Sequence, residues 1–386
     1  MKCLSTKATS IKPSGIRKFF DLASTMEGVI SLGVGEPDFA TPWHICENAI
    51  HYMSTGHTHY TANRGLLELR EEICKFHKEH YNQVYDPENE VIVTIGGSEA
   101  IDLCMRALLN PGDEVIVLDP NYVAYAPSVI LSDGVVVPLK LKEENDFKIL
   151  PEDLKKVITP KTKAMIINYP SNPTGGVMTK EDYAKIIDII KESGIYVISD
   201  EIYAELSFDQ PFASLAQFDE IKSQIIVVNG FSKAYAMTGW RLGYCMANKE
   251  LSSVMNKIHQ YVIMSAPVMS QYAGIEAIKN GYNDVLMMKE DYLKRRNLLV
   301  NRLNRMGLKT NMPHGTFYVF CNIQSTGLDS ETFCERLLQE QKVACVPGNA
   351  FGNSGEGYVR ISYAYSIDHI KEAVVRLEQF LKDLDN

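Results

Sequence analysis

The sequence predicts an α/β protein with a mostly parallel central sheet, helices on both faces of that sheet, and a smaller α+β part. Short segments that are apolar at every position alternate with helical patterns through the middle of the chain. Strands of this kind belong to parallel sheets that helices cover on both sides. The chain has 386 residues, which is too many for one ordinary core, so more than one domain is expected.

The middle of the chain supplies the predicted strands of the large sheet. They are, in chain order, residues 91–95, 115–118, 164–168, 195–199 and 225–228. A glycine-rich turn and a helical pattern through Leu109 follow the first of them. Before the fourth strand, Thr179 is expected to cap a helix that carries an isoleucine stripe and ends at Gly194.

The C-terminal part has a mixed pattern. A charged helix over roughly residues 288–306 precedes three predicted strands and a closing helix from Asp368. The three strands are residues 317–321, 343–346 and 358–362. We therefore predict a large domain over residues 46–285 and a small domain over residues 286–386. Residues 1–45 hold no complete core of their own and are expected to contribute to the small domain.

The composition is that of a soluble globular protein, with 45% hydrophobic and 23% charged residues. A net charge of −9 argues against nucleic acid or an anionic membrane as a partner. No apolar run approaches the length of a membrane span. Residues 1–20 contain no apolar core of a secretory signal.

The eight cysteines lack the short spacings of a zinc site or a disulfide framework. The closest two, Cys334 and Cys345, are eleven positions apart. Reduced, mostly buried thiols in a cytoplasmic protein are the expected state. His77, Glu79 and His80 have a loosely ligand-like spacing, but the solvated face of a polar helix explains it better, so no metal is expected.

Groups that bind ligands follow the predicted strands at the point where each strand ends. Residues 96–99 (Gly-Gly-Ser-Glu) offer backbone N–H groups at a helix N-terminus, which suits a phosphate. Tyr122, Asn172, Asp200 and Tyr203 follow three further strands. Alone, each group has a simpler explanation, namely turn geometry, core packing or a helix cap. Because ligands bind at the carboxyl ends of such strands, we expect these groups to converge on one cleft.

The last predicted strand leads to Lys233, with Ser232 before it and Arg241 eight positions after it. A lysine whose pKa is lowered by burial forms a Schiff base with an aldehyde. An arginine binds phosphate through its planar fork. An aldehyde that carries a phosphate describes pyridoxal phosphate, so this segment predicts a pyridoxal-phosphate site.

Taken together, the motifs resemble the fold-type I pyridoxal-phosphate aminotransferases of class I/II over nearly the whole chain. The matching segments are 31–39 (SLGVGEPDF), Tyr60 with Gly65, 96–100 (GGSEA), 171–175 (SNPTG), 199–203 (SDEIY), 232–241 and 358–362 (YVRIS). The resemblance implies an enzyme that moves an amino group from an L-amino acid to a 2-oxo acid.

The resemblance also implies roles around the cofactor ring. Lys233 holds the cofactor as a Schiff base and, once freed, moves a proton on the way to the pyridoxamine form. Asp200 pairs with the pyridine nitrogen and keeps it protonated. Tyr203 and Asn172 hydrogen-bond the phenolic oxygen, and Tyr122 stacks on the ring.

A phosphate site and a substrate site are implied as well. The residues expected to collect the phosphate are Gly97, Ser98, Glu99, Ser232 and Arg241. The carboxylate of Glu99 has to turn away from the phosphate. Tyr60 is expected to reach the cofactor of a neighbouring subunit, which makes a homodimer the functional unit. Arg360 clamps the substrate α-carboxylate, and Gly35, with Tyr122 and Asn172, lies close to the substrate.

The substrate is less well defined. Some aspartate-preferring members of the family carry a lysine where Ser98 stands, so we expect a neutral or aromatic donor, with 2-oxoglutarate or pyruvate as acceptor. A pyridoxal-phosphate β-C–S lyase on the same scaffold stays open, with an aminocyclopropane-carboxylate synthase-like reaction as a further variant. A non-catalytic protein that keeps the fold is the third alternative, although the intact Lys233 and Asp200 argue against it.

Overall fold

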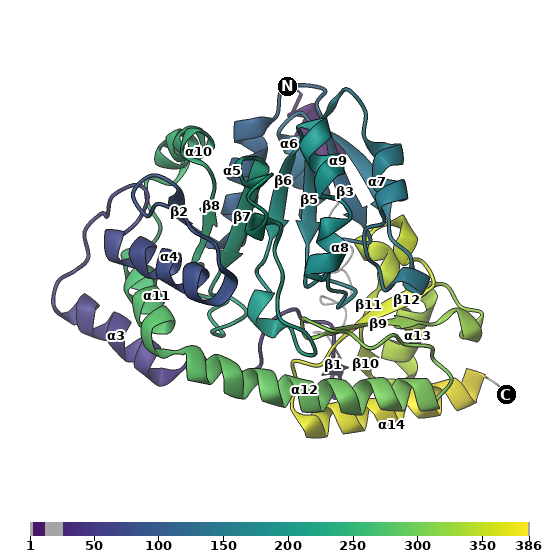
Figure 1. Cartoon of the computed structure of the whole chain (residues 1–386). Coiled ribbons are helices and arrows are strands. Elements are labelled where there is room, and N and C mark those ends of the chain that lie inside the picture. Colours follow the sequence, from purple (N-terminus) through teal and green to yellow (C-terminus); the bar gives the residue numbers. More distant parts are fainter. Residues whose placement is uncertain (1–2, 12–25, 385–386) are drawn as a thin grey trace.

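A seven-stranded sheet forms the centre of the larger part of the molecule (Figure 1). The computed structural model describes residues 3–11 and 26–384. The strand order is β2-β8-β7-β6-β5-β3-β4, and β8 runs in the opposite direction to the other six strands. The strands are β2 (Val91–Thr94), β3 (Glu114–Asp119), β4 (Val135–Lys140), β5 (Thr162–Asn168), β6 (Tyr196–Asp200), β7 (Ile225–Gly230) and β8 (Gly243–Met246). The predicted mostly parallel sheet is confirmed.

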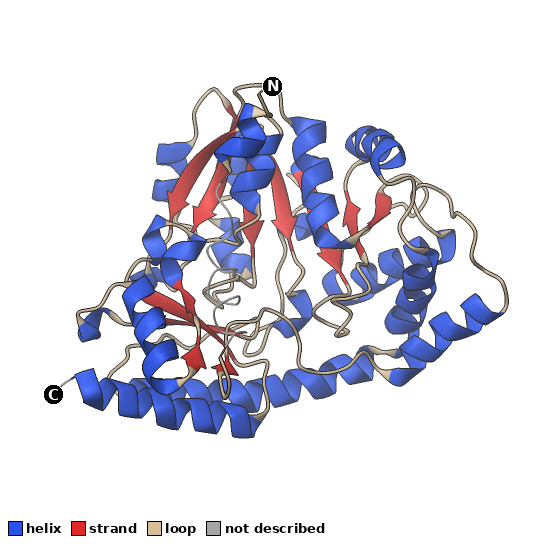
Figure 2. Cartoon of the chain, turned by 180° about the vertical axis from the view of Figure 1, so that it is seen from behind, coloured by secondary structure: helices blue, strands red, loops and turns tan. Residues whose placement is uncertain are grey.

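Helices cover both faces of this sheet (Figure 2). On one face lie α5 (Gly96–Leu108), α6 (Tyr125–Leu131) and α10 (Lys249–Val262). The other face packs against α3 (Trp43–Ser54), α4 (Leu67–Tyr81), α7 (Pro151–Val157), α8 (Lys180–Ala184), α9 (Ile187–Ser193) and α11 (Val268–Asn280). Alternate residues of one strand enter opposite cores, as Ile166 and Ile167 of β5 do, which explains why successive residues in the middle of these strands are apolar.

A smaller antiparallel sheet carries the C-terminal part, in the order β11-β12-β9. Its strands are β9 (Tyr318–Asn322), β11 (Val346–Pro347) and β12 (Tyr358–Ser362), and its helices are α12 (Tyr282–Arg305), α13 (Ser330–Gln341) and α14 (Ile367–Leu384). The N-terminal strand β1 (Ile30–Ser31) pairs with β10 (Val343–Ala344) beside this sheet. A boundary at residues 285/286 falls inside α12, which runs along the lower edge of both parts in Figure 1. The division into 46–285 and 286–386 therefore stays a prediction, with one continuous helix bridging it.

The first described residues divide between the two parts. Helix α1 (Thr6–Ser10) lies beside α6, where Lys7 pairs with Asp133 at 2.8 Å. Ile30 and Leu32 instead pack into the core of the smaller part. Residues 1–2 and 12–25 lie outside the described chain, so the prediction for residues 1–45 concerns partly undescribed residues.

Several expected elements differ in detail. The helix expected between Thr179 and Gly194 is two helices, because the chain breaks at Lys185 and Ile186, although Thr179 does form a capping box with Asp182. The single strand expected at residues 343–346 is β10 and β11, which belong to different sheets. His77 is fully buried and hydrogen-bonds Gln83 and Tyr244, so the expectation of a solvated helix face is wrong for it.

Six of the eight cysteines are buried and none is paired in a disulfide. Within residues 3–11 and 26–384, no helix combines the length and the apolarity that crossing a bilayer requires.

Candidate active site

A cavity of about 720 Å³ opens at the carboxyl ends of β5, β6 and β7. It brings together eleven of the thirteen predicted site residues. They are Gly35, Gly97, Ser98, Tyr122, Asn172, Asp200, Tyr203, Ser232, Lys233, Arg241 and Arg360. The two predicted residues that do not line it are Glu99 and Tyr60.

Lys233 lies three residues beyond the end of β7, with its amine in the cavity. The Nζ atom donates a hydrogen bond to the carbonyl oxygen of Gly35 at 2.6 Å. Burial lowers the pKa of this amine to about 8, and the charges of Arg360 and Arg241 push it the same way, against Glu36 and Asp200. About a tenth of the amine is therefore neutral near pH 7, far more than for an ordinary lysine, and the neutral amine is the state that attacks an aldehyde.

Asp200 is the last residue of β6 and is buried. Its Oδ2 accepts a hydrogen bond from the Tyr125 hydroxyl at 2.7 Å, and its Oδ1 accepts one from the backbone N–H of Ile202 at 3.2 Å. Burial raises the pKa of the carboxyl to about 6, while the bond from Tyr125 lowers it. A buried carboxyl at a cavity wall is suited to hold a cationic ring nitrogen, because the opposite charge offsets its desolvation.

Arg360, on β12, reaches across to the strand ends of the large sheet. Its Nη1 donates to Asn172 Oδ1 at 2.9 Å, and its Nη2 donates to the carbonyl oxygen of Gly33 at 2.7 Å. Its Nε is buried without a hydrogen-bond partner. No acidic side chain of the described chain forms an ion pair with Arg360. A buried guanidinium that lacks a counter-ion is suited to bind a carboxylate.

Tyr203 and Tyr318 complete the wall next to Arg360. Their hydroxyl oxygens are 2.9 Å apart, and either can donate the hydrogen bond. The Arg360 guanidinium stacks 4.2 Å from the Tyr318 ring centroid. A Cβ on Gly35 would lie 2.6 Å from the Tyr318 hydroxyl, so this position accepts no side chain without a shift. Gly35 thus keeps the space beside Lys233 open.

A second group of donors surrounds the N-terminus of α5. Gly96 has φ +67°, and a Cβ there would lie 2.8 Å from Nη2 of Arg241. Because glycine leaves this space free, the guanidinium reaches the first turn of the helix, beside Gly97, Ser98 and Ser232. Backbone N–H groups, hydroxyls and an arginine at one helix start form an anion site of the kind a phosphate needs.

Glu99 turns away from that anion site, as expected. One carboxylate oxygen accepts from the backbone N–H of Ile95, and the other pairs with Nδ1 of the buried His259. The negative charge is therefore held behind the helix start and not in the cavity.

These groups fit pyridoxal phosphate. The anion site around Arg241 matches its phosphate, the buried Asp200 matches its ring nitrogen, and the Lys233 amine matches its aldehyde. The fold and the cavity together define a pyridoxal-phosphate enzyme of fold type I. The family model for aminotransferase class I and II matches residues 27–377, and the chain belongs to this family.

Relatives at high identity support the same conclusion. A Bacillus subtilis protein that is named as a putative aminotransferase, YugH, is 51% identical over 98% of each chain. An aspartate aminotransferase of Pyrococcus abyssi is 45% identical over 98% of each chain. The crystal structure of an aromatic aminotransferase from Pyrococcus horikoshii superposes with a TM-score of 0.91 at 44% identity, over 95% of this chain and 99% of that one. The protein is a pyridoxal-phosphate-dependent aminotransferase, and its substrates are amino acids and 2-oxo acids.

Among the cavity residues that sequence reasoning did not assign to the site are Tyr125 and Tyr318. Tyr125 begins α6 one helical turn after Tyr122, and the two rings meet edge to face with centroids 5.5 Å apart. The spacing of the two tyrosines is the signal that identifies Tyr125. Tyr318 carries no such local signal, because its place depends on how the smaller sheet packs against the larger one.

Proposed function

We propose that this aminotransferase prefers neutral or aromatic L-amino acids as donors, with 2-oxoglutarate or pyruvate as acceptor. The observation that carries the proposal is the set of cations at the cavity. Among the described residues that line it, these are Lys233, Arg241 and Arg360. Each of them already has a partner in the proposed site: Lys233 binds the aldehyde of the cofactor, Arg241 its phosphate, and Arg360 the substrate α-carboxylate. A second carboxylate on the donor would meet Glu36 and no further cation of this chain, which disfavours it.

The proposed chemistry assigns one task to each residue. When bound, pyridoxal phosphate supplies a ring that accepts electrons from the substrate Cα. Lys233 Nζ takes the proton from that Cα, and Arg360 orients the substrate through its α-carboxylate. Asp200 keeps the ring nitrogen protonated. Tyr203 and Asn172 would bind the phenolic oxygen, and Tyr122 would offer its ring to the cofactor.

The donor preference is tested with a panel of L-amino acids, each with 2-oxoglutarate and with pyruvate. We expect phenylalanine, tyrosine or leucine to give a kcat/KM at least about tenfold above that of aspartate, because an unpaired buried charge is costly. Aspartate as the best donor by a wide margin contradicts the proposal.

Two controls sharpen this panel. The variant Glu36→Gln keeps the shape of the side chain and removes its charge, so it should improve aspartate relative to phenylalanine. Cystathionine without a 2-oxo acid tests the lyase alternative: sustained release of pyruvate and ammonia would favour elimination over transamination.

We further propose that a homodimer is the functional unit and that Tyr60 acts in the partner's site. Tyr60 is 83% exposed and Tyr261 is 85% exposed. Further exposed apolar side chains, Trp43, Met53 and Met264, lie on α3 and after α10, and Asn63 bonds to the Met264 carbonyl at 2.8 Å. Exposed apolar side chains of this kind are typical of an interface.

Mixed dimers test the role of Tyr60. We expect Tyr60→Ala to weaken cofactor affinity about tenfold or more, because it loses a hydrogen bond to a charged phosphate. Mixing it with an inactive Lys233→Ala protein should restore activity, since a mixed dimer then contains one site with both residues. No restoration, or a mass of 43.4 kDa for the active enzyme in light scattering, argues against the proposal.

A cytoplasmic location is proposed from the thiols. All eight cysteines are unpaired, although Cys334 and Cys345 have sulfur atoms 3.4 Å apart. A reducing compartment keeps such a pair reduced. Cell fractionation checks this, and recovery of the protein outside the cytoplasm would contradict it.

A further inference from the structure

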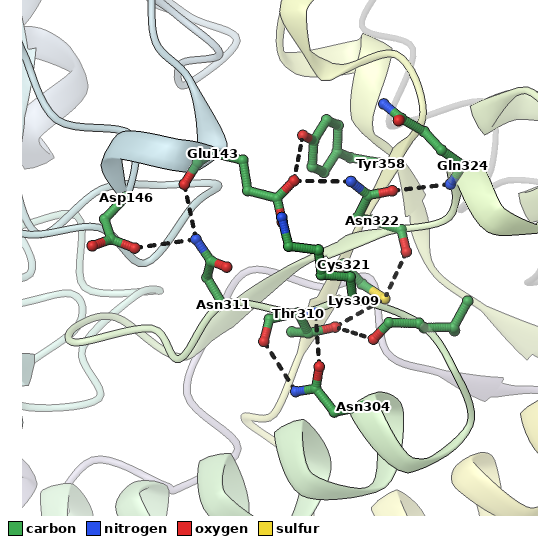
Figure 3. Close-up of polar contacts among 11 residues, drawn as sticks. Glu143, Asp146, Asn304, Lys309, Thr310, Asn311, Cys321, Asn322, Gln324 and Tyr358 are labelled. Atoms are coloured by element: carbon green, nitrogen blue, oxygen red, sulfur yellow. Dashed lines mark hydrogen bonds and ion pairs between the residues drawn. The ribbon is translucent and has the colours of Figure 1, made fainter.

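Glu143 joins the larger sheet to the smaller one (Figure 3). It begins a short 3₁₀ helix, η1 (Glu143–Asn145), just after β4, the edge strand of the seven-stranded sheet. Its Oε2 accepts hydrogen bonds from Asn322 Nδ2 at 2.9 Å and from the Tyr358 hydroxyl at 3.0 Å. Its Oε1 pairs with Lys309 Nζ at 3.2 Å, and the side chain is only 10% exposed.

The partners of Glu143 lie on the two strands that place Arg360. Tyr358 begins β12, Asn322 ends β9, and the two stand opposite each other in the antiparallel register. Arg360 is two residues beyond Tyr358, so both side chains leave the same face of the strand. The residue opposite Arg360 is Phe320, whose ring stacks on that of Tyr358 with centroids 4.8 Å apart.

Residues 143–147, which include η1, make further contacts with the smaller part of the molecule. The Asn311 amide donates to the Glu143 carbonyl at 3.0 Å and to Asp146 Oδ1 at 3.1 Å. Phe147 packs edge to face on Phe320 and Tyr358. None of these residues lines the cavity, so the contact cannot act by touching substrate or cofactor.

We propose that Glu143 is a positioning residue that anchors the start of β12 and thereby fixes where Arg360 meets the substrate carboxylate. The inference rests on the proposed role of Arg360. Without the carboxylate, Tyr358 and Asn322 lose the acceptor that ties the start of β12 to the larger sheet. The packing of Phe147 on Tyr358 remains, but fewer contacts then fix the strand that carries Arg360. The arginine then has to be ordered by the substrate that it binds, which weakens binding.

The test compares Glu143→Ala with Glu144→Ala. The neighbouring Glu144 is 70% exposed and forms a 3.8 Å pair with Lys142. For Glu143→Ala we expect KM to rise roughly three- to thirtyfold, with kcat changed less than about twofold. The rise should be the same for L-phenylalanine, L-leucine and 2-oxoglutarate, because all three present an α-carboxylate. Cofactor affinity should be unchanged, and Glu144→Ala should behave as the wild type.

Milder variants separate positioning from general destabilisation. Glu143→Gln keeps an oxygen that accepts from Tyr358 and Asn322, so its KM should lie between those of the wild type and Glu143→Ala. Tyr358→Phe removes one donor and should also raise KM. These variants serve the test if Glu143→Ala does not fold.

Arg360→Ala distinguishes failure of this inference from failure of the proposed function. It should raise KM by about 30-fold or more, because it removes a charged partner of a buried carboxylate. If it does not, the carboxylate assignment of Arg360 is wrong. Suppose instead that Arg360→Ala raises KM as expected. The positioning role is then overturned if Glu143→Ala and its milder variants lower only the melting temperature or kcat, or if Glu144→Ala raises KM equally.

Discussion

Lys233→Ala is expected to reduce transamination by about 10²- to 10⁴-fold or more, because the variant loses the proton-transfer group. No other group at the cavity replaces it. Among the described residues that line the cavity, the remaining cations are Arg241 and Arg360. Guanidinium groups stay protonated up to a pH of about 12, so they neither form a Schiff base nor take a proton.

Borohydride reduction of the holoenzyme checks this directly. Mass spectrometry should find the trapped cofactor on the peptide that contains Lys233 in the wild type, and no adduct in the variant. Lys294→Ala is a matched control, because Lys294 lies on the surface of α12, where it pairs with Glu290 at 2.8 Å. An adduct at another lysine, or a variant with near-normal turnover, would remove Lys233 from its role.

The lowered pKa of Lys233 adds a pH dependence to the same experiment. Because burial brings the pKa to about 8, the neutral amine increases as pH rises from 7 to 9. Capture of pyridoxal phosphate by the apoprotein should therefore accelerate with pH, reach half of its maximum near pH 8 and level off above about pH 9. A rate that keeps rising toward pH 10 would indicate an amine with the ordinary pKa of lysine.

The sequence was sufficient for features that depend on neighbours along the chain. Asp200 and Lys233 follow fully apolar strands, and such strands end together at one edge of a parallel sheet. The edge strand β4 was not predicted, since it contains Pro138 and half-exposed valines, which only an edge tolerates. The antiparallel β8 was not predicted, because its four residues, Gly-Tyr-Cys-Met, include a glycine and no β-branched side chain.

Contacts between the two sheets could not be predicted from local patterns. Tyr318 meets Tyr203, and Glu143 meets Tyr358, across more than a hundred residues. Nothing near either residue in the sequence specifies its partner. The break of the expected strand 343–346 into β10 and β11 has a similar origin, because β10 pairs with the distant β1 while β11 pairs with β12 in another sheet. The contacts of Tyr318 and Glu143, which surround Arg360 or its strand, therefore depend on tertiary packing and not on local sequence.

Asp200→Ala is expected to retain cofactor poorly and to lose most turnover. An opposite charge beside a titratable group shifts its pKa by about 1–3 units, and each unit corresponds to about 1.4 kcal/mol. Loss of the carboxylate should therefore reduce turnover by roughly 10- to 1000-fold through the ring nitrogen alone. Asp200→Asn keeps the shape of the side chain but not its charge, so it should be nearly as impaired.

Tyr125→Phe tests the charge of Asp200 without changing Asp200 itself, because the variant keeps the ring and removes the hydroxyl that donates to the carboxylate. The bond from the Tyr125 hydroxyl lowers the pKa of Asp200, which burial raises to about 6. Removing the hydroxyl should raise that pKa, so activity should begin to fall at a higher pH on the acid side than in the wild type. The measurement is the pH profile of kcat with saturating donor. Two results would show that this carboxylate does not control the charge on the ring. One is an Asp200 variant with normal rates, and the other is a Tyr125→Phe enzyme whose activity falls at the same acidic pH as that of the wild type.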